Sequence, residues 1–495
     1  MADVGTKSFR PWSPRQMYLM PPSPTEWLPD GHLAYFILEL VERLDLRPIE
    51  AAIASKDARG ERPYAPRLLV ALLIYGYCVG MFSSRKLARA TYEDVAFLVL
   101  AGGAHPHFTT INQFRLEYRE VFARLFVQVL RLCRRAGLVK LGHVALDGTK
   151  ILANASKHKA MSYERMQEED ARLRGEINEL LANADRIDKE EDERYGVGLA
   201  PEDLPEELRR REARLERINR AMEELEQEAA QARAEELRDQ ASGQRERAAD
   251  PTADEVGRKR NATRAERSEA RANKLDPPNE DPPASTGGDL PHHRVPHTTE
   301  GKPGPKAQRN FTDPDSRIMT KDGSYVQAYN AQIVVDEAAQ IIVAQAVTNQ
   351  APDQEHLLPM LARVEQSLGR CPRRISADAG YYADANVRGC EAANVTAYIA
   401  ASRTPHASTA QRPPAPPSPL RAAMIAKLQS PEGHAVYSRR KVIAEPPFGQ
   451  IKTAQGFRRF SLRGILKVRC EWALVSLTHN VLKLFRNAPE IMLGA

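Results

Sequence analysis

The chain has 495 residues, with 71 Lys and Arg against 65 Asp and Glu and a formal net charge of +6. That length exceeds one ordinary core, so we expect two or three domains. No run reaches the roughly 18 unbroken apolar residues of a membrane span, and the first residues lack the apolar stretch of a signal peptide. The five cysteines form no CxxC pair, which argues against disulfides and structural zinc. We therefore expect a cytoplasmic protein without a membrane partner.

The charge is distributed unevenly along the chain. Residues 161–240 carry 14 Lys and Arg against 25 Asp and Glu, whereas residues 371–495 carry 18 against 7. The acidic run is typical of a solvated helix face. The basic C-terminal region indicates a polyanionic partner.

The N-terminal part reads as a series of short helices. Apolar residues from Leu33 to Leu44 recur with a helical period after Asp30, a possible cap, and a long helical pattern ends at Gly137. Short helices with capped turns suggest a bundle of the helix-turn-helix kind, although composition alone favours a bundle that only packs. We assign residues 1–140 to a helical N-terminal DNA-binding domain. Three residues at the start of the long helix could read base edges or could pack: Asn112, Gln113 and Arg115.

The pattern changes after residue 140. The stretch HVALD, residues 143–147, predicts a short core strand that ends in an acid. Heptad-like apolar rows then predict an inserted antiparallel helical hairpin over residues 161–240. Residues 241–308 are rich in Pro, Gly and charge and poor in apolar residues, so we expect a disordered linker.

Strand signals return in the last third of the chain. Residues 326–336 and 341–348 predict a hairpin, RISAD (374–378) predicts a strand ending in an acid, and VTAYIA (395–400) predicts another, with helices between and after them. The fold class expected is α/β, with a core of mixed strand direction built from residues 141–160 and 309–495. The Pro-rich residues 412–419 interrupt it.

Two acids follow predicted core strands, where α/β folds place their sites. If the strands of Asp147 and Asp378 are neighbours, the carboxylates converge and require a cation, for which hard oxygen ligands favour Mg²⁺ or Mn²⁺. Glu445 would be the third ligand. Taken alone, Glu445 before two prolines reads as an acid at a helix start. Other acids, namely Asp313, Asp315 and Asp353, read as turn and cap residues.

Cations surround Glu445 in the stretch YSRRKVIAEPPFGQIK, residues 437–452. One carboxylate does not balance them, so we expect phosphate oxygens to supply the remaining negative charge. Seven residues separate Glu445 from Lys452, which places both on one helix face. Lys452, Arg458 and Arg459 are expected on backbone phosphates rather than on bases.

Several segments resemble bacterial insertion-sequence transposases with a DDE catalytic triad on an RNase-H-like core. They are VALDGTKILANASKHKAM, SYVQAYNAQIVVD, ISADAGYYAD and RRKVIAEPPFGQIKTAQGFRRFSLRG. The segments WLPDGHLAYFILELVERLDLR, MFSSRKLARA and HPHFTTINQFR resemble the helical domain of the same transposases. The resemblance implies that Asp147, Asp378 and Glu445 form the triad and hold the metal.

The resemblance also implies DNA-contacting residues around the glutamate. The family signature has a tyrosine and an arginine before the glutamate, but Tyr437 and Arg440 lie one residue further upstream than that pattern. Either Lys441 takes the basic position or the turn is bulged. Tyr437, Arg440 and Lys441 are all expected on DNA.

The expected activity is that of a metal-dependent nucleotidyl transferase with an endonuclease step. It would cut double-stranded DNA at transposon ends and join the 3′-hydroxyl to target DNA by two-metal-ion chemistry, as a homodimer on DNA in the bacterial nucleoid. Two alternatives remain: a structure-selective RNase-H-like nuclease without strand transfer, and a catalytically inert, domesticated DNA-binding protein.

Overall fold

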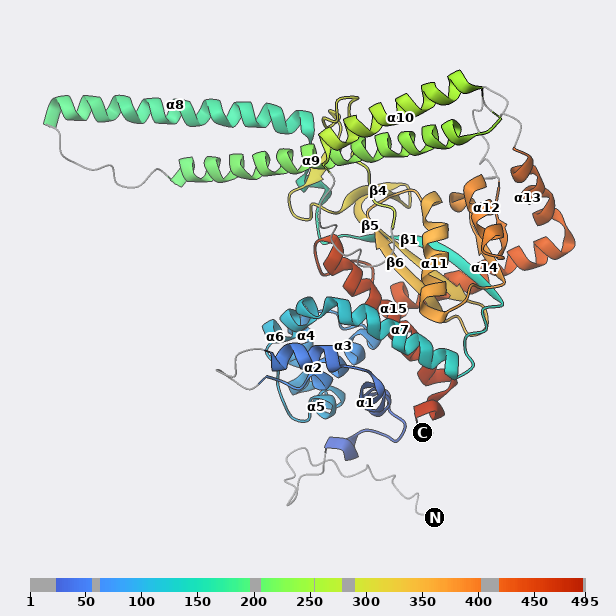
Figure 1. The fold of residues 1–495 in the computed structure, drawn as a ribbon. Helices are drawn as coiled ribbons and strands as arrows, with labels where there is room; N and C mark the ends of the chain where they lie inside the picture. The colour runs from blue at the N-terminus through green and yellow to red at the C-terminus, as the bar shows by residue number, and fades with distance from the viewer. Residues whose placement is uncertain are drawn as a thin grey trace, which may run out of the picture. The chain divides into compact units, whose positions relative to one another are not determined.

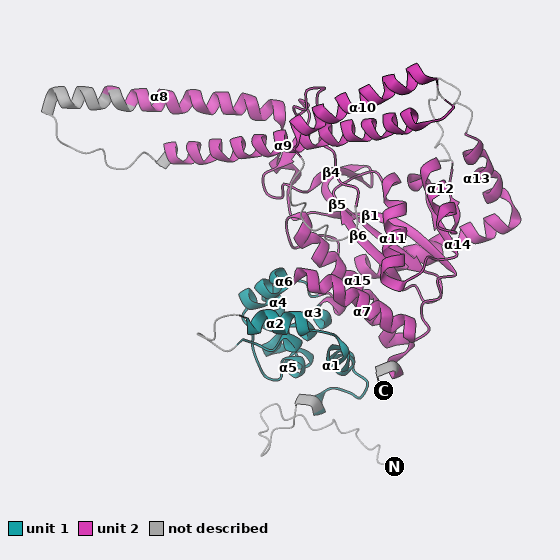
Figure 2. Cartoon of the chain, viewed as in Figure 1, with its two compact units in different colours: residues 1–76, 81–117, 492–495 teal, residues 77–80, 118–491 magenta. Residues whose placement is uncertain are grey.

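A computed structural model describes residues 24–55, 63–195, 206–252, 254–277, 290–401 and 418–492 (Figure 1). The chain divides into two compact units (Figure 2). The first comprises residues 1–76, 81–117 and 492–495, and the second comprises residues 77–80 and 118–491. No helix among the described residues is long and apolar enough to cross a membrane.

The first unit is helical, as the sequence predicts. Helix α1 buries one face with Phe36, Ile37 and Leu40, and its cap is His32, whose ring accepts from the Ala34 N–H, rather than Asp30. The long helix predicted to end at Gly137 is broken at Tyr118, and its second part, α7 (Arg119–Arg135), belongs to the second unit. The helices of the first unit are α1 (Leu33–Arg43), α2 (Arg47–Ala54), α3 (Pro66–Cys78, whose last two residues fall in the second unit), α4 (Ser84–Glu93), α5 (Val95–Ala101) and α6 (Phe108–Glu117).

The second unit is built on a mixed six-stranded sheet, so the α/β fold class is confirmed. Its strands are β1 (His143–Leu152), β4 (Arg317–Lys321), β5 (Ser324–Asp336), β6 (Ile342–Thr348), β7 (Arg374–Ala377) and β8 (Thr396–Ile399). The order is β4-β5-β1-β7-β8, with β6 also paired to β5. Strand β5 is antiparallel to β1, β4 and β6, whereas β7 is parallel to both β1 and β8.

Helices before and after these strands complete the core. They are α7, α11 (Leu357–Leu368), α12 (Asp384–Ala392), α13 (Pro419–Gln429), α14 (Pro431–Gly449) and α15 (Ile465–Asn487). Helix α15 is buried along most of its length and includes Trp472, because it packs against β6 and α7. Residues 402–417, which hold most of the Pro-rich interruption, lie outside the described residues.

The segment around Glu445 differs from prediction. The prolines do not open a helix: α14 begins at Pro431, where the Ser430 hydroxyl accepts from the Gly433 N–H at 3.1 Å, and Pro446 and Pro447 lie inside it. Proline removes backbone donors and crowds the preceding turn. The chain then widens into a π-helix over Gln450–Ala454.

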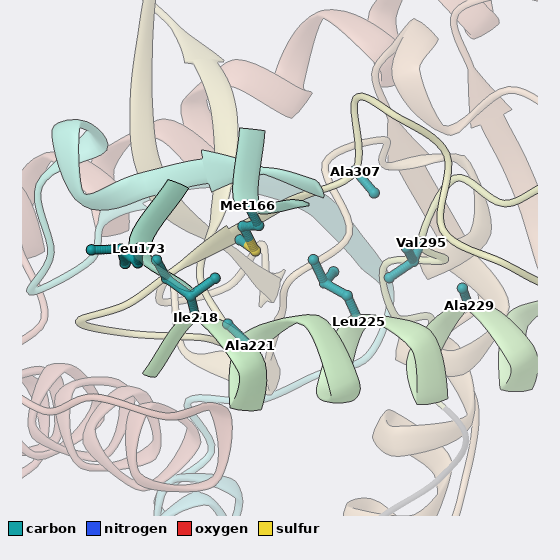
Figure 3. Packing of buried hydrophobic residues seen from close by; sticks show 8 residues of the cluster. All are labelled: Met166, Leu173, Ile218, Ala221, Leu225, Ala229, Val295 and Ala307. Atoms are coloured by element: carbon teal, nitrogen blue, oxygen red, sulfur yellow. The ribbon is translucent and has the colours of Figure 1, made fainter. Parts of the chain in front are cut away.

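The predicted inserted hairpin forms from α8 (Tyr163–Tyr195) and α9 (Glu206–Ala249). Glu169 pairs with Arg214 at 2.7 Å and Glu176 pairs with Arg211 at 3.1 Å, so the two helices run antiparallel. Figure 3 shows the cluster at their base, which includes residues from beyond the hairpin. Its members are Met166, Leu173, Ile218, Ala221, Leu225, Ala229, Val295 and Ala307.

The disordered linker predicted over residues 241–308 is wrong for most of its length. Helix α9 continues to Ala249, and a further helix, α10, runs over Glu255–Leu275. Alanines pack the two helices: Ala234 and Leu237 of α9 form a buried cluster with Ala272 of α10. Close packing of small side chains therefore stabilises the contact between α9 and α10, although the segment contains few large apolar residues. Residues 278–289 lie outside the described residues.

Candidate active site

Asp147 and Asp378 lie on neighbouring parallel strands. Strands β1 and β7 pair Ala145 with Ser376, and the same register two residues further places Asp147 beside Asp378. The predicted juxtaposition of the two strands is therefore confirmed. Asp378 directly follows β7, but β1 continues to Leu152 because the long strand β5 pairs with it throughout.

The Asp147 carboxylate lies in a largely buried, charged environment. It accepts from the Gly148 N–H at 2.9 Å and lies 3.7 Å from the Arg440 guanidinium. The pKa of Asp147 is raised to about 6, chiefly by burial and also by the charges of Asp378 and Asp353, while Arg440 and the Gly148 N–H act to lower it. Negative charge thus accumulates here beyond what one arginine balances.

Helix α14 brings two predicted DNA-contacting residues to Asp147. The Arg440 guanidinium lies 6.0 Å from the centroid of the Tyr437 ring, a cation–π distance. Burial raises the pKa of Tyr437, as do the nearby charges of Asp378 and Asp147, while Arg440 lowers it. Arg440 and Tyr437 therefore belong to the carboxylate site, whereas Lys441 is exposed on α14.

Lys452 reaches the same strand from the π-helix. Its ammonium donates to the hydroxyl of Thr149, two residues beyond Asp147 on β1, and lies 5.4 Å from the centroid of the Phe448 ring. Burial lowers the pKa of Lys452. Residues two apart on a strand point to the same side, so Lys452 joins Arg440 near Asp147.

Glu445 is not part of this cluster in the structure. It is exposed on α14, and its carboxylate has no hydrogen bond or ion pair with a described residue. The shared face predicted for Glu445 and Lys452 assumed a continuous α-helix, but a π-helix over Gln450–Ala454 contains Lys452. Among the described residues, no group of three or more His, Cys, Asp or Glu is arranged to hold a metal ion.

A third carboxylate near the pair is one that the sequence analysis assigned to a helix cap. Asp353 makes no cap bond; its Oδ1 accepts from Lys150 at 3.2 Å, Asn330 at 2.7 Å and Gln332 at 2.8 Å. Asn330 and Gln332 are fully buried in the apolar strand β5. Their presence in YNAQIVV was the available signal, since buried amides need polar partners.

The network continues from Gln332 to the backbone beside Asp147. The Tyr381 hydroxyl donates to Gln332 Oε1, and burial together with the three nearby carboxylates raises the pKa of Tyr381. A Cβ on Gly148 would lie 2.3 Å from Gln332 Nε2 and 2.9 Å from the Tyr381 hydroxyl, so a side chain there would displace both groups. The sequence motif DG thus reflects close packing of the network against β1.

The remaining predicted contacts are more scattered. Arg458 donates from Nε to the Lys452 carbonyl at 3.1 Å, and both Arg458 and Arg459 are exposed. In the first unit, Arg115 is only 3% exposed. It donates to the Phe82 carbonyl at 3.3 Å and to Asn112 Oδ1 at 3.0 Å, which is the packing alternative. Gln113 is exposed.

Asp313 and Asp315 do cap a helix, as predicted. Asp313 accepts from the Gly464 N–H at 3.0 Å and from the Tyr329 hydroxyl at 2.8 Å, and Asp315 accepts from the Ile465 N–H at 2.7 Å. These contacts fix the start of α15. They leave Asp147, Asp378 and Asp353 as the carboxylates gathered on the sheet.

Comparison with protein families gives two matches. Residues 289–481 match the transposase DDE domain, and residues 22–117 match the transposase domain DUF772. No curated protein and no solved structure matches significantly. The first match contains Asp378 and Glu445, while Asp147 precedes it, and the second ends where the first compact unit gives way to the second. Two transposase domains that together cover more than half of the chain, with an RNase-H-like sheet, identify the protein as an insertion-sequence DDE transposase.

Proposed function

We propose that this transposase cuts double-stranded DNA at the ends of its element and joins the freed 3′-hydroxyl to target DNA, with Mg²⁺ or Mn²⁺ held by Asp147, Asp378 and Glu445. DDE transposases are DNA-acting nucleotidyl transferases with an endonuclease step and generally use divalent metal. The observation that carries the proposal is the placement of Asp147 beside Asp378 on adjacent parallel strands.

The donor set fits a hard divalent cation. Carboxylate oxygens are the ligands that Mg²⁺ and Mn²⁺ prefer. The raised pKa of Asp147, about 6, reflects burial and repulsion from Asp378 and Asp353, both of which a bound cation would relieve. A divalent ion bound there would polarise the cleaved phosphate and activate the attacking water or hydroxyl.

Glu445 completes the set only by turning toward the sheet. Its carboxylate is not engaged by any described residue, and its helix already contacts Asp147 through Arg440. Arg440 and Lys452 lie on either side of Glu445 in sequence, and both reach β1. We propose that DNA phosphate attracts these two cations, which frees Asp147 from Arg440 and draws Glu445 into the site.

The test is an assay with labelled oligonucleotides that carry the DNA flanking the gene. With Mg²⁺ the wild-type chain should yield nicked and then joined products. Asp147→Asn, Asp378→Asn and Glu445→Gln should each lower cleavage more than about 100-fold, since even a residue one step removed from a metal ion can cost that much. All three should retain DNA binding, because the phosphate-contacting cations remain.

Glu266→Gln is the matched control, since Glu266 is exposed on α10, a helix outside the sheet that carries the carboxylate pair. A variant with near-normal cleavage would remove its residue from the triad. Nicks without joined products would favour a nuclease, and binding without any metal-dependent cleavage would favour an inert DNA-binding protein.

A further inference from the structure

A row of cations accompanies β1 beyond the carboxylates. Lys452 bonds to Thr149, and Arg459 forms a backbone bridge with Leu152 at the end of the strand. Arg463 then donates from Nε to the Asn154 carbonyl at 3.0 Å. The C-terminal segment therefore places a positive side chain at successive points along β1, moving away from Asp147.

The row ends in a cavity of about 660 Å³ at the end of β1. Its lining residues include five that carry or can carry positive charge and no acid: Lys157, His158, Lys159, Arg459 and Arg463. Tyr325 also lines it and is 67% exposed. Such a lining of cations with an exposed aromatic ring suits a nucleic-acid backbone better than a neutral metabolite.

A second cavity, of about 370 Å³, adjoins the first, because His158 and Lys159 line both. Its other wall is formed in part by Arg214 and Arg217 of α9, in the inserted hairpin. Arg214 shares its charge with Glu169 at 2.7 Å, whereas Arg217 forms no ion pair with a described residue. The basic lining therefore continues from the core onto the insertion.

We propose that the two cavities form one groove that binds the DNA backbone several nucleotides from the cleaved phosphate, and that the inserted hairpin thereby contributes to DNA binding. The inference rests on the proposed function, in which Asp147 marks the cleaved phosphate. From Asp147 to Leu152 the strand rises about 17 Å, the length of roughly five base-pair steps of B-DNA. The groove therefore receives phosphates several nucleotides from the cut, through contacts that do not read sequence.

The test measures binding to a random-sequence DNA duplex over a range of salt concentrations, with EDTA present so that cleavage plays no part. Lys157→Ala with Lys159→Ala should reduce the slope of log affinity against log salt by about two, and Arg217→Ala by about one. These side chains are exposed, so melting temperatures should not change. Lys140→Ala with Arg388→Ala is the control, because both residues are exposed and line neither cavity.

Wild-type affinity and salt slope in the groove variants would overturn the inference, and so would an equal loss in the control, which would indicate a general charge effect. Loss from the core pair but not from Arg217→Ala would remove the hairpin from the groove. If the wild-type chain itself fails to bind duplex DNA, the proposed function fails, a result distinct from failure of the groove alone.

Discussion

The carboxylate network of the sheet and the inserted helices α8 to α10 are both rich in charge but use it differently. In the Arg440–Asp147 pair the side chains are 12% and 18% exposed, whereas in the Arg220–Glu216 pair of α9 they are 65% and 71% exposed. A change to one buried charge shifts stability strongly, in a direction set by the balance between the cost of burial and the gain from its partner. Exposed pairs are screened by water and contribute little. The burial of its ion pairs therefore determines how much charge contributes to the stability of a region, more than the number of those pairs does.

Where the hairpin attaches to the core, the inserted helices also form buried ion pairs. Arg309 and Arg317 are both buried, and they donate to Glu228 of α9 at 2.7 and 3.1 Å. Charge near the sheet thus follows the buried pattern even when one partner belongs to the insertion.

The largest effect should come from Asp353→Ala. The variant leaves the donors of Lys150, Asn330 and Gln332 without their shared acceptor, which should cost about 3 kcal/mol of unfolding free energy, by analogy with broken buried pairs. Cleavage should also fall by about 10- to 100-fold, as for other residues that support metal ligands. Denaturant unfolding and the oligonucleotide assay measure the two effects.

Asp353→Asn, which keeps one acceptor oxygen, is the graded comparison and should lose less stability. A fully stable Asp353→Ala would show that the network is not essential to the fold. The buried charges of the sheet would then contribute no more to stability than the exposed charges of the inserted helices.

Asp147→Asn should have an intermediate effect of opposite sign. The folded-state pKa of Asp147, about 6, lies above its ordinary value of 3.8, so ionisation destabilises the folded state and stability falls as pH rises from about 4 to 6. Removal of the charge should therefore stabilise the metal-free protein at pH 7.5 by about 1 to 3 kcal/mol, since each unit of pKa shift is worth about 1.4 kcal/mol.

This gain should vanish below about pH 4, where the wild-type carboxyl is protonated in both the folded and the unfolded chain. Unfolding in urea at the two pH values, without divalent metal, tests the sign. A variant that is less stable at pH 7.5 would mean that the bond with Arg440 outweighs the cost of burial.

The smallest effect should come from Arg220→Ala on α9. Its pair with Glu216 is exposed, so the free energy of unfolding should change by less than about 0.5 kcal/mol. Arg317→Ala is the matched buried variant and should cost several times more, because it leaves Glu228 near the core with one partner fewer. Equal losses of unfolding free energy in the two variants would show that burial does not determine what these ion pairs contribute.

Apolar patterns in the sequence predicted every strand of the sheet except β4 and placed Asp147 and Asp378 at strand ends, whereas the pairing of their two strands entered only as a condition. Strand β5 is buried without interruption from Gln327 to Asp336, so a run of strand-forming residues, rather than an alternating pattern, identifies it. The role of Asp353 was missed because its partners Lys150, Asn330 and Gln332 come from two other strands. Helix α10 was missed because alanine packing leaves only a weak apolar signal.

Glu445 shows a second limit of prediction from local sequence, which is the choice of where a helix begins. Its prolines fit a helix start, but Ser430 and Pro431 supply a start further upstream, and a local pattern does not indicate which start the chain uses. The shared face of Glu445 and Lys452 was inferred from an uninterrupted helical period. The π-helix between them breaks that period.

The π-helix determines the direction in which Lys452 and the residues after it point. Each residue of an α-helix advances the chain by about 100°, and a π-turn amounts to an extra residue in the winding. Rewinding Gln450–Ala454 as α-helix would turn Lys452 away from Thr149 and re-aim the arginines that follow. A one-residue insertion or deletion here would thus misalign the cations without replacing any of them. The spacing between Glu445 and Lys452 is therefore under as much constraint as their chemical identities.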